Sequence, residues 1–286
     1  MRVFVVDFGG TRLKWGLFSS EELERKGILS SQVVYSVRDF KEFLRGFSFD
    51  RLVLGFAGMV KDGVVIHSPN LPNWEGLNLY EEFKDFYPIV ENDANLFILG
   101  EYHYGSAKGY KNALGITLGT GVGGGAIING KLLRGKNNFA GEFGHMVIDI
   151  NGPPCNCGSF GCAESFLGEY YFLERVRRAF LRHGQNPPSD MKVLEDMAKM
   201  GLDLARSLWE EYGRYLGVLI SNLISAFDPD IVVLGGGISN AFELFKDSMM
   251  EEILRRKVGY RFEVPIVKAK LENSSLYGGL YLANLL

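Results

Sequence analysis

Apolar runs that end in glycine recur three times along the chain and predict buried strands that open into tight turns. Residues 3–7 (VFVVD) run into DFGGT, residues 113–133 contain LGTGVGGG between two apolar runs, and residues 230–239 read DIVVLGGGIS. Short apolar runs bounded by glycine are typical of buried strands. Glycine lets a backbone approach a phosphate, and consecutive N–H groups in such turns can bind an anion. A two-lobed molecule that clamps one nucleotide between its lobes would need such turns.

Helical periodicity predicts most of the other elements. Within residues 39–47, Phe40 and Phe43 begin an i, i+3, i+4, i+7 apolar face, and Asp39 is placed as the N-cap. Residues 134–162 are rich in Gly, Asn, Pro and Cys and predict an irregular excursion. Further helices are expected at 92–105, 163–181, most of 192–227, 241–257 and 276–286, and further strands at 13–18 and 51–58. This mixture fits one large α/β domain or two lobes.

The composition narrows the class of protein. Of 286 residues, 47% are hydrophobic and 23% charged, and the formal net charge is −3, without the basic excess of a nucleic-acid-binding protein. The first apolar run is broken at Asp7, too early for a signal peptide, and no apolar stretch is long enough for a membrane span. We therefore expect a cytoplasmic protein that binds neither nucleic acid nor membrane.

All three cysteines lie in the segment CNCGSFGC, at Cys155, Cys157 and Cys162. Disulfides are rare in the cytoplasm, so this spacing favours a metal over a cystine. The best fourth ligand is His145, ten residues before Cys155. Zinc with three thiolates and one imidazole has a complete shell, which indicates a structural rather than a catalytic ion. Reduced structural thiols or a redox pair are the alternatives.

Several motifs resemble those of one known family. The three glycine turns are similar to the phosphate and adenosine segments of the actin-like, hexokinase-like ATPase superfamily. The segment 155–164 (CNCGSFGCAE) fits every fixed position of CxCGxxGCxE, the signature of the ROK family of bacterial sugar kinases and sugar-responsive repressors. The resemblance extends to GEFGH (141–145), NDAN (92–95) and SPNLPNW (68–74) and covers nearly the whole chain.

The resemblance implies a two-lobed actin-like ATPase fold, which is ribonuclease H-like α/β, with a cleft between the lobes. The small lobe is expected at residues 1–113, with a closing helix at about 272–286 packed back on it. The large lobe is expected at 114–271, with the zinc loop and the adenosine segment. Sugar is expected in the cleft, and Mg²⁺ is expected to bridge the phosphates of ATP. We also expect a homodimer or homotetramer.

The resemblance also implies roles for individual residues. Asp93 would be the catalytic base, whereas the pattern alone favours a plain N-cap. Asp7 would lie near the metal–nucleotide, or only order its own turn. The expected sugar contacts are Gly58, Asn92, Asp93, Glu142, His145 and Glu164. The expected nucleotide contacts are Asp7, Gly9, Gly10, Thr11, Gly119, Thr120, Gly121, Gly235, Gly236 and Gly237. Because the nucleotide turns lie outside the excursion 134–162, loss of zinc is expected to weaken sugar binding more than nucleotide binding.

The implied activity is ATP-dependent phosphorylation of a hexose hydroxyl. SPNLPNW resembles the glucokinases of the family, which favours glucose and glucose 6-phosphate. Ala57 and Ala163 depart from many of those relatives. Kinases for N-acetylmannosamine, N-acetylglucosamine, fructose, mannose or allose share the motifs and remain alternatives. A sugar-sensing transcriptional regulator is a further alternative, although a strand starting at residue 3 leaves no room for a preceding helix-turn-helix. A sugar-binding protein without activity is the last.

Overall fold

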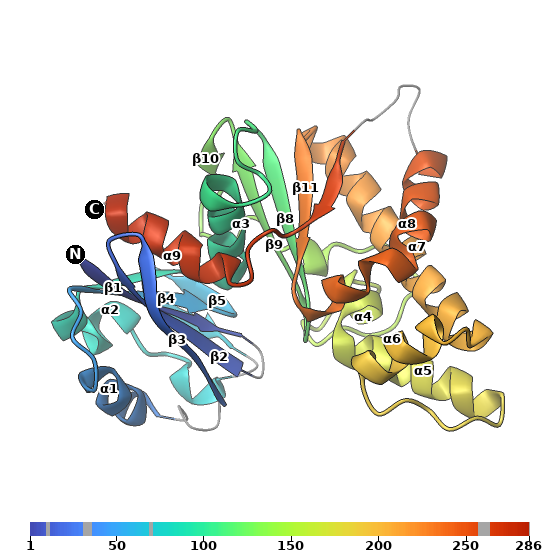
Figure 1. The fold of residues 1–286 in the computed structure, drawn as a ribbon, viewed down its shortest axis with the longest axis horizontal. Coiled ribbons are helices and arrows are strands. Elements are labelled where there is room, and N and C mark those ends of the chain that lie inside the picture. Colours follow the sequence, from blue (N-terminus) through green and yellow to red (C-terminus); the bar gives the residue numbers. More distant parts are fainter. Residues whose placement is uncertain (10–11, 31–35, 69–70, 257–263, 286) are drawn as a thin grey trace. The chain divides into compact units, whose positions relative to one another are not determined.

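The computed structural model describes residues 1–286 apart from 10–11, 31–35, 69–70, 257–263 and 286 (Figure 1). The chain forms two compact units. The first comprises residues 1–115, 125–141 and 269–286, and the second comprises residues 116–124 and 142–268. The division expected from the sequence placed residues 125–141 with the second part.

A five-stranded sheet forms the framework of the first unit. Its strand order is β3-β2-β1-β4-β7, with β1 antiparallel to β2 and parallel to β4. The strands are β1 (Arg2–Phe8), β2 (Arg12–Ser19), β3 (Glu22–Ser30), β4 (Arg51–Phe56) and β7 (Pro88–Asn92). The strands expected at 3–7, 13–18 and 51–58 are confirmed. The strand β3 was not expected, because four of its nine residues are charged, six are exposed, and they form no long apolar run.

Aromatic side chains fill one face of this sheet. Phe8 of β1 contacts Phe40 of α1 and Trp74, and both of these contact Phe83; all four are buried in one core cluster with Phe4. This layer contains α1 (Val37–Arg45), η2 (Pro72–Trp74), α2 (Leu79–Glu82) and η3 (Lys84–Phe86). A short hairpin, β5 (Met59–Lys61) and β6 (Val64–His67), follows β4.

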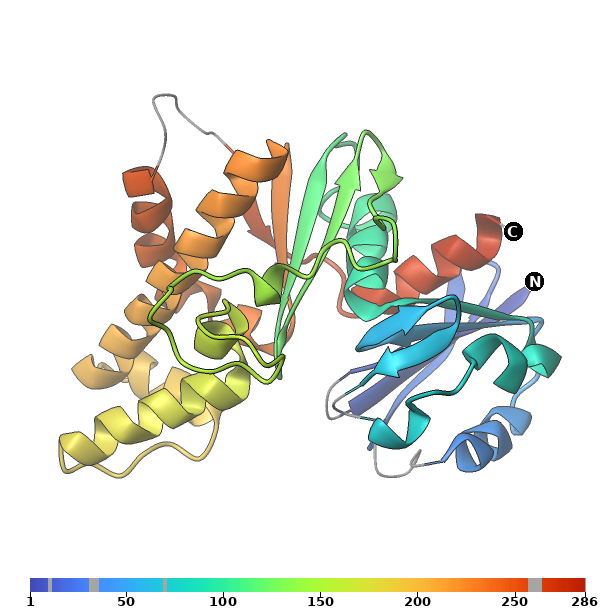
Figure 2. The same ribbon diagram turned by 180° about the vertical axis from the view of Figure 1, so that it is seen from behind.

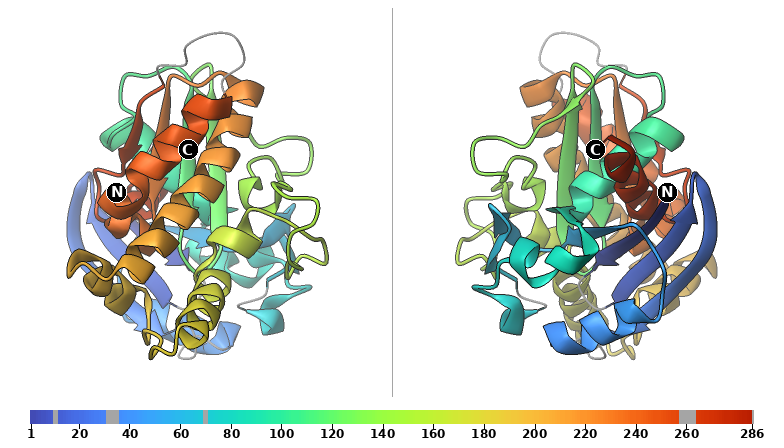
Figure 3. Two further views of the ribbon diagram at one scale, coloured as in Figure 1. Left: turned by 90° about the vertical axis from the view of Figure 1, so that its right-hand side faces the viewer. Right: turned by 90° about the vertical axis from the view of Figure 1, so that its left-hand side faces the viewer.

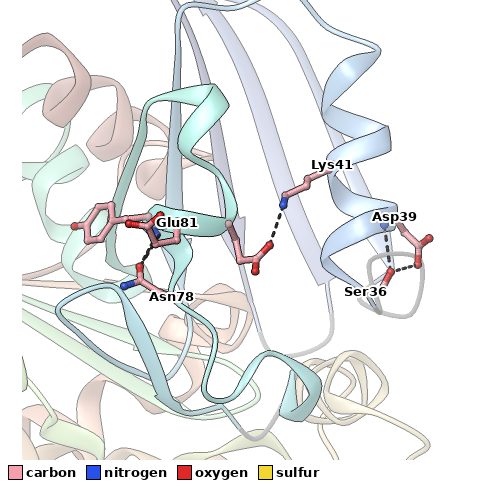
Figure 4. A network of polar contacts seen from close by, with 7 residues as sticks. Ser36, Asp39, Lys41, Asn78 and Glu81 are labelled. Atoms are coloured by element: carbon pink, nitrogen blue, oxygen red, sulfur yellow. Dashed lines mark hydrogen bonds and ion pairs between the residues drawn. The ribbon is translucent and has the colours of Figure 1, made fainter.

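The first helix begins earlier than the sequence pattern suggested, and the expected N-cap at Asp39 is wrong. Ser36 is the N-cap: its hydroxyl accepts a hydrogen bond from the Asp39 backbone N–H at 3.2 Å and donates one to the Asp39 carboxylate at 2.6 Å (Figure 4). Asp39 instead lies in the first turn, where its negative charge is favourable near the partial positive charge of the helix N-terminus. Ser36 therefore caps the helix, and Asp39 adds a favourable charge in its first turn.

Ser36→Ala should lower the free energy of unfolding by about 1 kcal/mol, because it leaves a first-turn N–H without its acceptor. Asp39→Ala should cost less, about 0.3–1 kcal/mol, since it removes the first-turn charge and the acceptor of the Ser36 hydroxyl but leaves the capping hydrogen bond to the Asp39 N–H in place. Urea unfolding of the two variants beside the parent chain measures both values. If Asp39→Ala lowered the free energy of unfolding more than Ser36→Ala, Asp39 and not Ser36 would be the N-cap.

Two helices of the first unit, α3 (Asp93–Tyr104) and α9 (Ser274–Leu285), pack against each other and are joined by a buried carboxylate. Glu101 has no exposed surface. It accepts hydrogen bonds from the backbone N–H groups of Lys270 and Leu271, at 3.1 and 3.0 Å. It also accepts one from the Ser274 hydroxyl at 2.7 Å. The expected helix at the end of the chain is therefore present, and its start is fixed to α3 by one side chain.

A second five-stranded sheet has the order β10-β9-β8-β11-β12. The strands are β8 (Ala113–Leu118), β9 (Val122–Ile128), β10 (Lys131–Leu132), β11 (Ile231–Gly235) and β12 (Ile266–Lys268). The strand, glycine turn and strand expected over 113–133, and the strand followed by a glycine turn expected over 230–239, are confirmed. The glycine turn after β11 leads into η5 (Gly237–Ala241).

The helices of the second unit pack around aromatic residues. They are α4 (Glu164–Leu167), α5 (Glu169–Arg182), α6 (Met191–Lys199), α7 (Asp203–Phe227) and α8 (Phe242–Arg256). Helices α7 and α8 lie side by side (Figure 3), and Trp209 and Tyr212 of α7 contact Phe172 of α5 and Phe245 of α8. Among the described helices, none has the length and apolar character needed to cross a bilayer.

The single helix expected over 163–181 is instead two helices that meet at Gly168. The backbone of Gly168 is extended, with φ −65° and ψ 141°. The next N–H, that of Glu169, donates to the carbonyl of Gly119 at 2.9 Å instead of continuing a helix from α4. A contact with a distant turn therefore decides where α4 ends.

The excursion at residues 134–162 is irregular, as expected from its composition (Figure 2). Its one described helical turn is η4 (Phe143–His145). Isolated bridges pair Val147 with Cys162 and Pro154 with Phe160. These bridges bring the cysteine segment back toward the residues that follow GEFGH.

Candidate functional site

The first glycine turn follows Asp7, whose partners were not identified from the sequence. The Cα of Asp7 lies opposite that of Lys14 across β1 and β2. Burial raises the pKa of Asp7, while the positive charge of Lys14 and a side-chain hydrogen bond with Ser275 counteract the rise. Opposite charges across paired strands stabilise each other. Gly9 is at the start of the turn, and the expected contacts Gly10 and Thr11 lie outside the described residues.

The second and third glycine turns lie together in the second unit. The second turn, Gly119 to Gly121, joins β8 to β9, and Thr120 at its tip is exposed. The third follows Gly235 at the end of β11. A Cβ built on Gly236, which has φ +82°, would lie 2.2 Å from the carbonyl oxygen of Leu118, so the third turn contacts the end of β8.

The backbone of these two turns is open to a ligand at two positions. A Cβ added at Gly119 or Gly237 would meet no atom within 4 Å. These two positions therefore leave the backbone of both turns accessible.

The start of α3 separates the two roles considered for Asp93. The N-cap is Asn92, whose side-chain oxygen accepts hydrogen bonds from the N–H groups of Ala94 at 2.9 Å and Asn95 at 3.1 Å. Asp93 is the first residue inside the helix. The alternative that Asp93 is only the N-cap is therefore wrong, because Asn92 already accepts the hydrogen bonds of that position.

Glu91, which the sequence analysis missed, anchors this turn. It is 8% exposed. One carboxylate oxygen accepts from the Asn92 N–H at 3.0 Å and from the Asn95 side-chain amide at 2.9 Å. The other accepts from Nε and Nη2 of Arg134, at 2.9 and 2.8 Å. The only sign of this role in the sequence was a carboxylate next to NDAN. Its partner Arg134 is 43 residues away along the chain.

A cavity of about 600 Å³ lies beside this anchor within the first unit. Gly58, Asn92, Tyr80 and Arg134 contribute to its wall, together with apolar residues such as Leu282. Gly58, with φ +135°, follows β4. The cavity therefore places two of the expected sugar contacts, Gly58 and Asn92, on one concave surface.

The four expected metal ligands come together in the second unit. The ligand atoms of His145, Cys155, Cys157 and Cys162 all lie within 4.8 Å of one another. Cys157 Sγ is 3.7 Å from Cys162 Sγ, too far for a disulfide bond, and Cys155 Sγ is 3.8 Å from Nδ1 of His145. Ligands bound to a tetrahedral zinc lie about 3.5–3.8 Å apart, so the donor atoms and their spacing fit this metal.

The thiols need a cation to become ligands together. Burial raises the pKa of Cys155 to about 12 and also raises that of Cys162, whereas at Cys157 burial is outweighed by hydrogen bonds, among them one from the Ser159 backbone, which lower the pKa. Zinc binds thiolates and deprotonates coordinating thiols. Tyr171 of α5 supports the segment, because its hydroxyl accepts a hydrogen bond from the Asn156 N–H at 2.9 Å. The segment between Cys155 and Cys157 is thus held to a regular helix.

The two expected sugar carboxylates lie next to this cluster. Glu142 Oε2 is 3.9 Å from Nε2 of His145, the ring nitrogen not facing Cys155. Burial raises the pKa of Glu142; His145 counteracts this and Glu164 adds to it. Oε1 of Glu164 is 3.9 Å from Cys155 Sγ, and Oε2 accepts a hydrogen bond from the Val122 N–H at 3.0 Å. Both carboxylates therefore lie within 3.9 Å of a residue of the cluster.

The two sheets with their glycine turns define an α/β ATPase of the actin-like, ribonuclease H-like class. The ROK family model matches residues 3–285, and the chain belongs to the ROK family. A glucokinase from Thermotoga maritima is 31% identical over 280 residues, covering 89% of this chain and 87% of that protein. An N-acetyl-D-glucosamine kinase from Vibrio atlanticus is 29% identical over 314 residues, covering 98% of each. The crystal structure of a Streptomyces griseus glucokinase in complex with glucose and AMPPNP has a TM-score of 0.86 and 28% identity, covering 100% of both chains.

Proposed function

We propose that this protein is an ATP-dependent sugar kinase that transfers a phosphoryl group to a hexose hydroxyl, with glucose as the preferred acceptor and glucose 6-phosphate as the product. The observation that carries the proposal is the start of α3, where Asn92 provides the N-cap and Asp93 follows it inside the helix. A carboxylate at the expected position of the base is thus present without being needed as the cap. The similarity to glucokinases supports the substrate.

In this mechanism Asp93 accepts the proton of the attacking hydroxyl. Phosphoryl transfer depends mainly on positioning and on stabilising charge around the transferred group, so the base and the glycine turns carry the chemistry. The turns at Gly119 to Gly121 and Gly235 to Gly237 would donate backbone N–H groups to the nucleotide. Asp7 would lie beside Mg²⁺, which neutralises charge on the phosphates when it is bound with ATP.

The sugar would be held by hydrogen bonds to its hydroxyl groups. The proposed contacts, taken from the family resemblance, are Gly58, Asn92, Asp93, Glu142, His145 and Glu164. Zinc at His145 and the three cysteines would be structural, because four protein ligands leave no open position. Nδ1 of His145 would bind the metal, and Nε2 would remain on the side of Glu142 and the sugar.

A coupled assay of ADP formation with about ten hexoses and N-acetylated amino sugars tests the proposal. We expect glucose to give the highest kcat/KM. An N-acetylated amino sugar is the second candidate, because the cavity beside Gly58 and Asn92 exceeds the needs of a bare hexose and a relative acts on N-acetyl-D-glucosamine. No ADP formation with any sugar, despite sugar binding, would instead favour a sensor or regulator.

A further inference from the structure

Glu164 contacts the second glycine turn as well as the metal cluster. Its Oε2 accepts a hydrogen bond from the N–H of Val122 at 3.0 Å, directly after the turn from Gly119 to Gly121. A Cβ built on Gly121 would lie 2.4 Å from the same oxygen, so the carboxylate lies directly against the turn. Both partners belong to the second unit.

A second hydrogen bond attaches the same segment to the same turn. The N–H of Glu169, at the start of α5, donates to the carbonyl of Gly119 at 2.9 Å. Within the turn, the N–H of Gly119 donates to the carbonyl of Gly121 at 3.0 Å. The residues from Glu164 to Glu169 therefore hold the turn near both of its ends, before and after the exposed Thr120.

We propose that Glu164 is a positioning residue for this phosphate turn, in addition to its proposed contact with the sugar. This inference rests on the proposed function, since it takes the turn to bind nucleotide. The two oxygens divide the tasks: Oε2 fixes the Val122 N–H, and Oε1 faces the side of Cys155. A sugar hydroxyl that binds Glu164 thereby orders the turn, which couples sugar binding to nucleotide binding.

The charge of Glu164 and its hydrogen bond to Val122 have opposite expected effects on nucleotide affinity. The direction of the measured change therefore shows which of the two dominates. A carboxylate near a phosphate repels it, so removal of the charge alone would strengthen nucleotide binding. Removal of the acceptor for the Val122 N–H would loosen the turn and weaken nucleotide binding. Glutamine removes the charge but keeps an oxygen acceptor, whereas alanine removes both.

The experiment measures the affinity for ADP with Mg²⁺, in the absence of sugar, by titration calorimetry. A hydrogen bond to an ionised group changes an equilibrium constant by about tenfold or more, so Glu164→Ala should weaken ADP binding about tenfold. Glu164→Gln should bind ADP at least as well as the parent. The matched control is Glu142→Gln, which removes the other proposed sugar carboxylate and should leave ADP affinity without sugar unchanged. If Glu164→Ala fails to fold, Glu164→Asp keeps the charge but shortens the reach, and should weaken ADP binding.

Equal or tighter ADP binding by Glu164→Ala would overturn the inference, as would equal weakening by Ala and Gln. Glucose affinity, measured on the same variants, separates this outcome from failure of the proposed function. Weakened glucose binding with unchanged ADP binding would reject the positioning role and retain the sugar site. Weakened ADP binding with unchanged glucose binding would retain the positioning role and reject Glu164 as a sugar contact. Coupling is tested by adding glucose, which should improve ADP affinity in the parent but not in Glu164→Ala.

Discussion

Asp93→Asn should fold and bind ADP like the parent chain but lose about 10²–10⁴-fold in kcat, the usual contribution of a positioned base. The substitution keeps the size of the side chain and removes its ability to accept the hydroxyl proton. It leaves the N-cap intact, because the oxygen that accepts from Ala94 and Asn95 belongs to Asn92. A loss of turnover therefore cannot be attributed to loss of the cap.

The measurements are kcat in the coupled ADP assay, ADP affinity by calorimetry and the unfolding midpoint in urea. Asn92→Ala is the matched control: it should lower the free energy of unfolding by about 1 kcal/mol by removing the cap. Asp93→Asn should lower it by less, because the side chain keeps its size and one oxygen acceptor while the favourable charge of a first-turn residue is lost. Turnover of Asp93→Asn within a few-fold of the parent would reject Asp93 as the base.

Cys157→Ser should purify without zinc, where the parent chain should carry about one zinc per chain. Structural zinc contributes on the order of 10 kcal/mol of apparent folding energy in small peptides, more than an irregular segment can replace. Cys157 is the exposed cysteine of the three, so serine adds no buried polar group at this position. We expect a large rise in the sugar KM, because the cluster lies next to Glu142 and Glu164.

The effect on nucleotide should be larger than the sequence suggested. The glycine turns lie outside the excursion, but Glu164 Oε2 holds the N–H of Val122 after the second turn. Loss of the metal should therefore weaken ADP binding as well. Elemental analysis and kinetics with both substrates measure these effects. Asn156→Ala, at an exposed neighbour that is not a ligand, should keep the metal and serves as the control. A metal-free Cys157→Ser protein with unchanged sugar kinetics would contradict the structural role of zinc.

Features carried by local sequence were predictable. The glycine turns, the apolar strands and the cysteine spacing each lie within a short segment, and the structure has the strands and the His–Cys cluster where they were expected. The charged strand β3 was missed because its pairing with β2, and not its own apolar pattern, makes it a strand. The cap of α1 was misplaced by three residues, from Ser36 to Asp39, because both residue types make good caps.

Contacts between distant residues were beyond the reach of the sequence pattern. Arg134 reaches Glu91 from 43 residues away, and Val122 reaches Glu164 from 42. The sequence pattern did not point to Lys14 as the partner of Asp7, and the pairing of β1 with β2 places it there. In each case the fold supplies a partner for a buried or half-buried carboxylate, and no local spacing rule contains that information.

The buried carboxylate of Glu101 also affects the order in which the two units can fold during synthesis. Its partners Lys270, Leu271 and Ser274 leave the ribosome only after every residue of the second unit, which ends at residue 268. Until then α3 lacks α9 as its packing partner, and a carboxylate that is fully buried in the finished protein stays in water. The second unit can therefore complete its fold before synthesis ends. The first unit completes its fold last, although its strands are synthesised first.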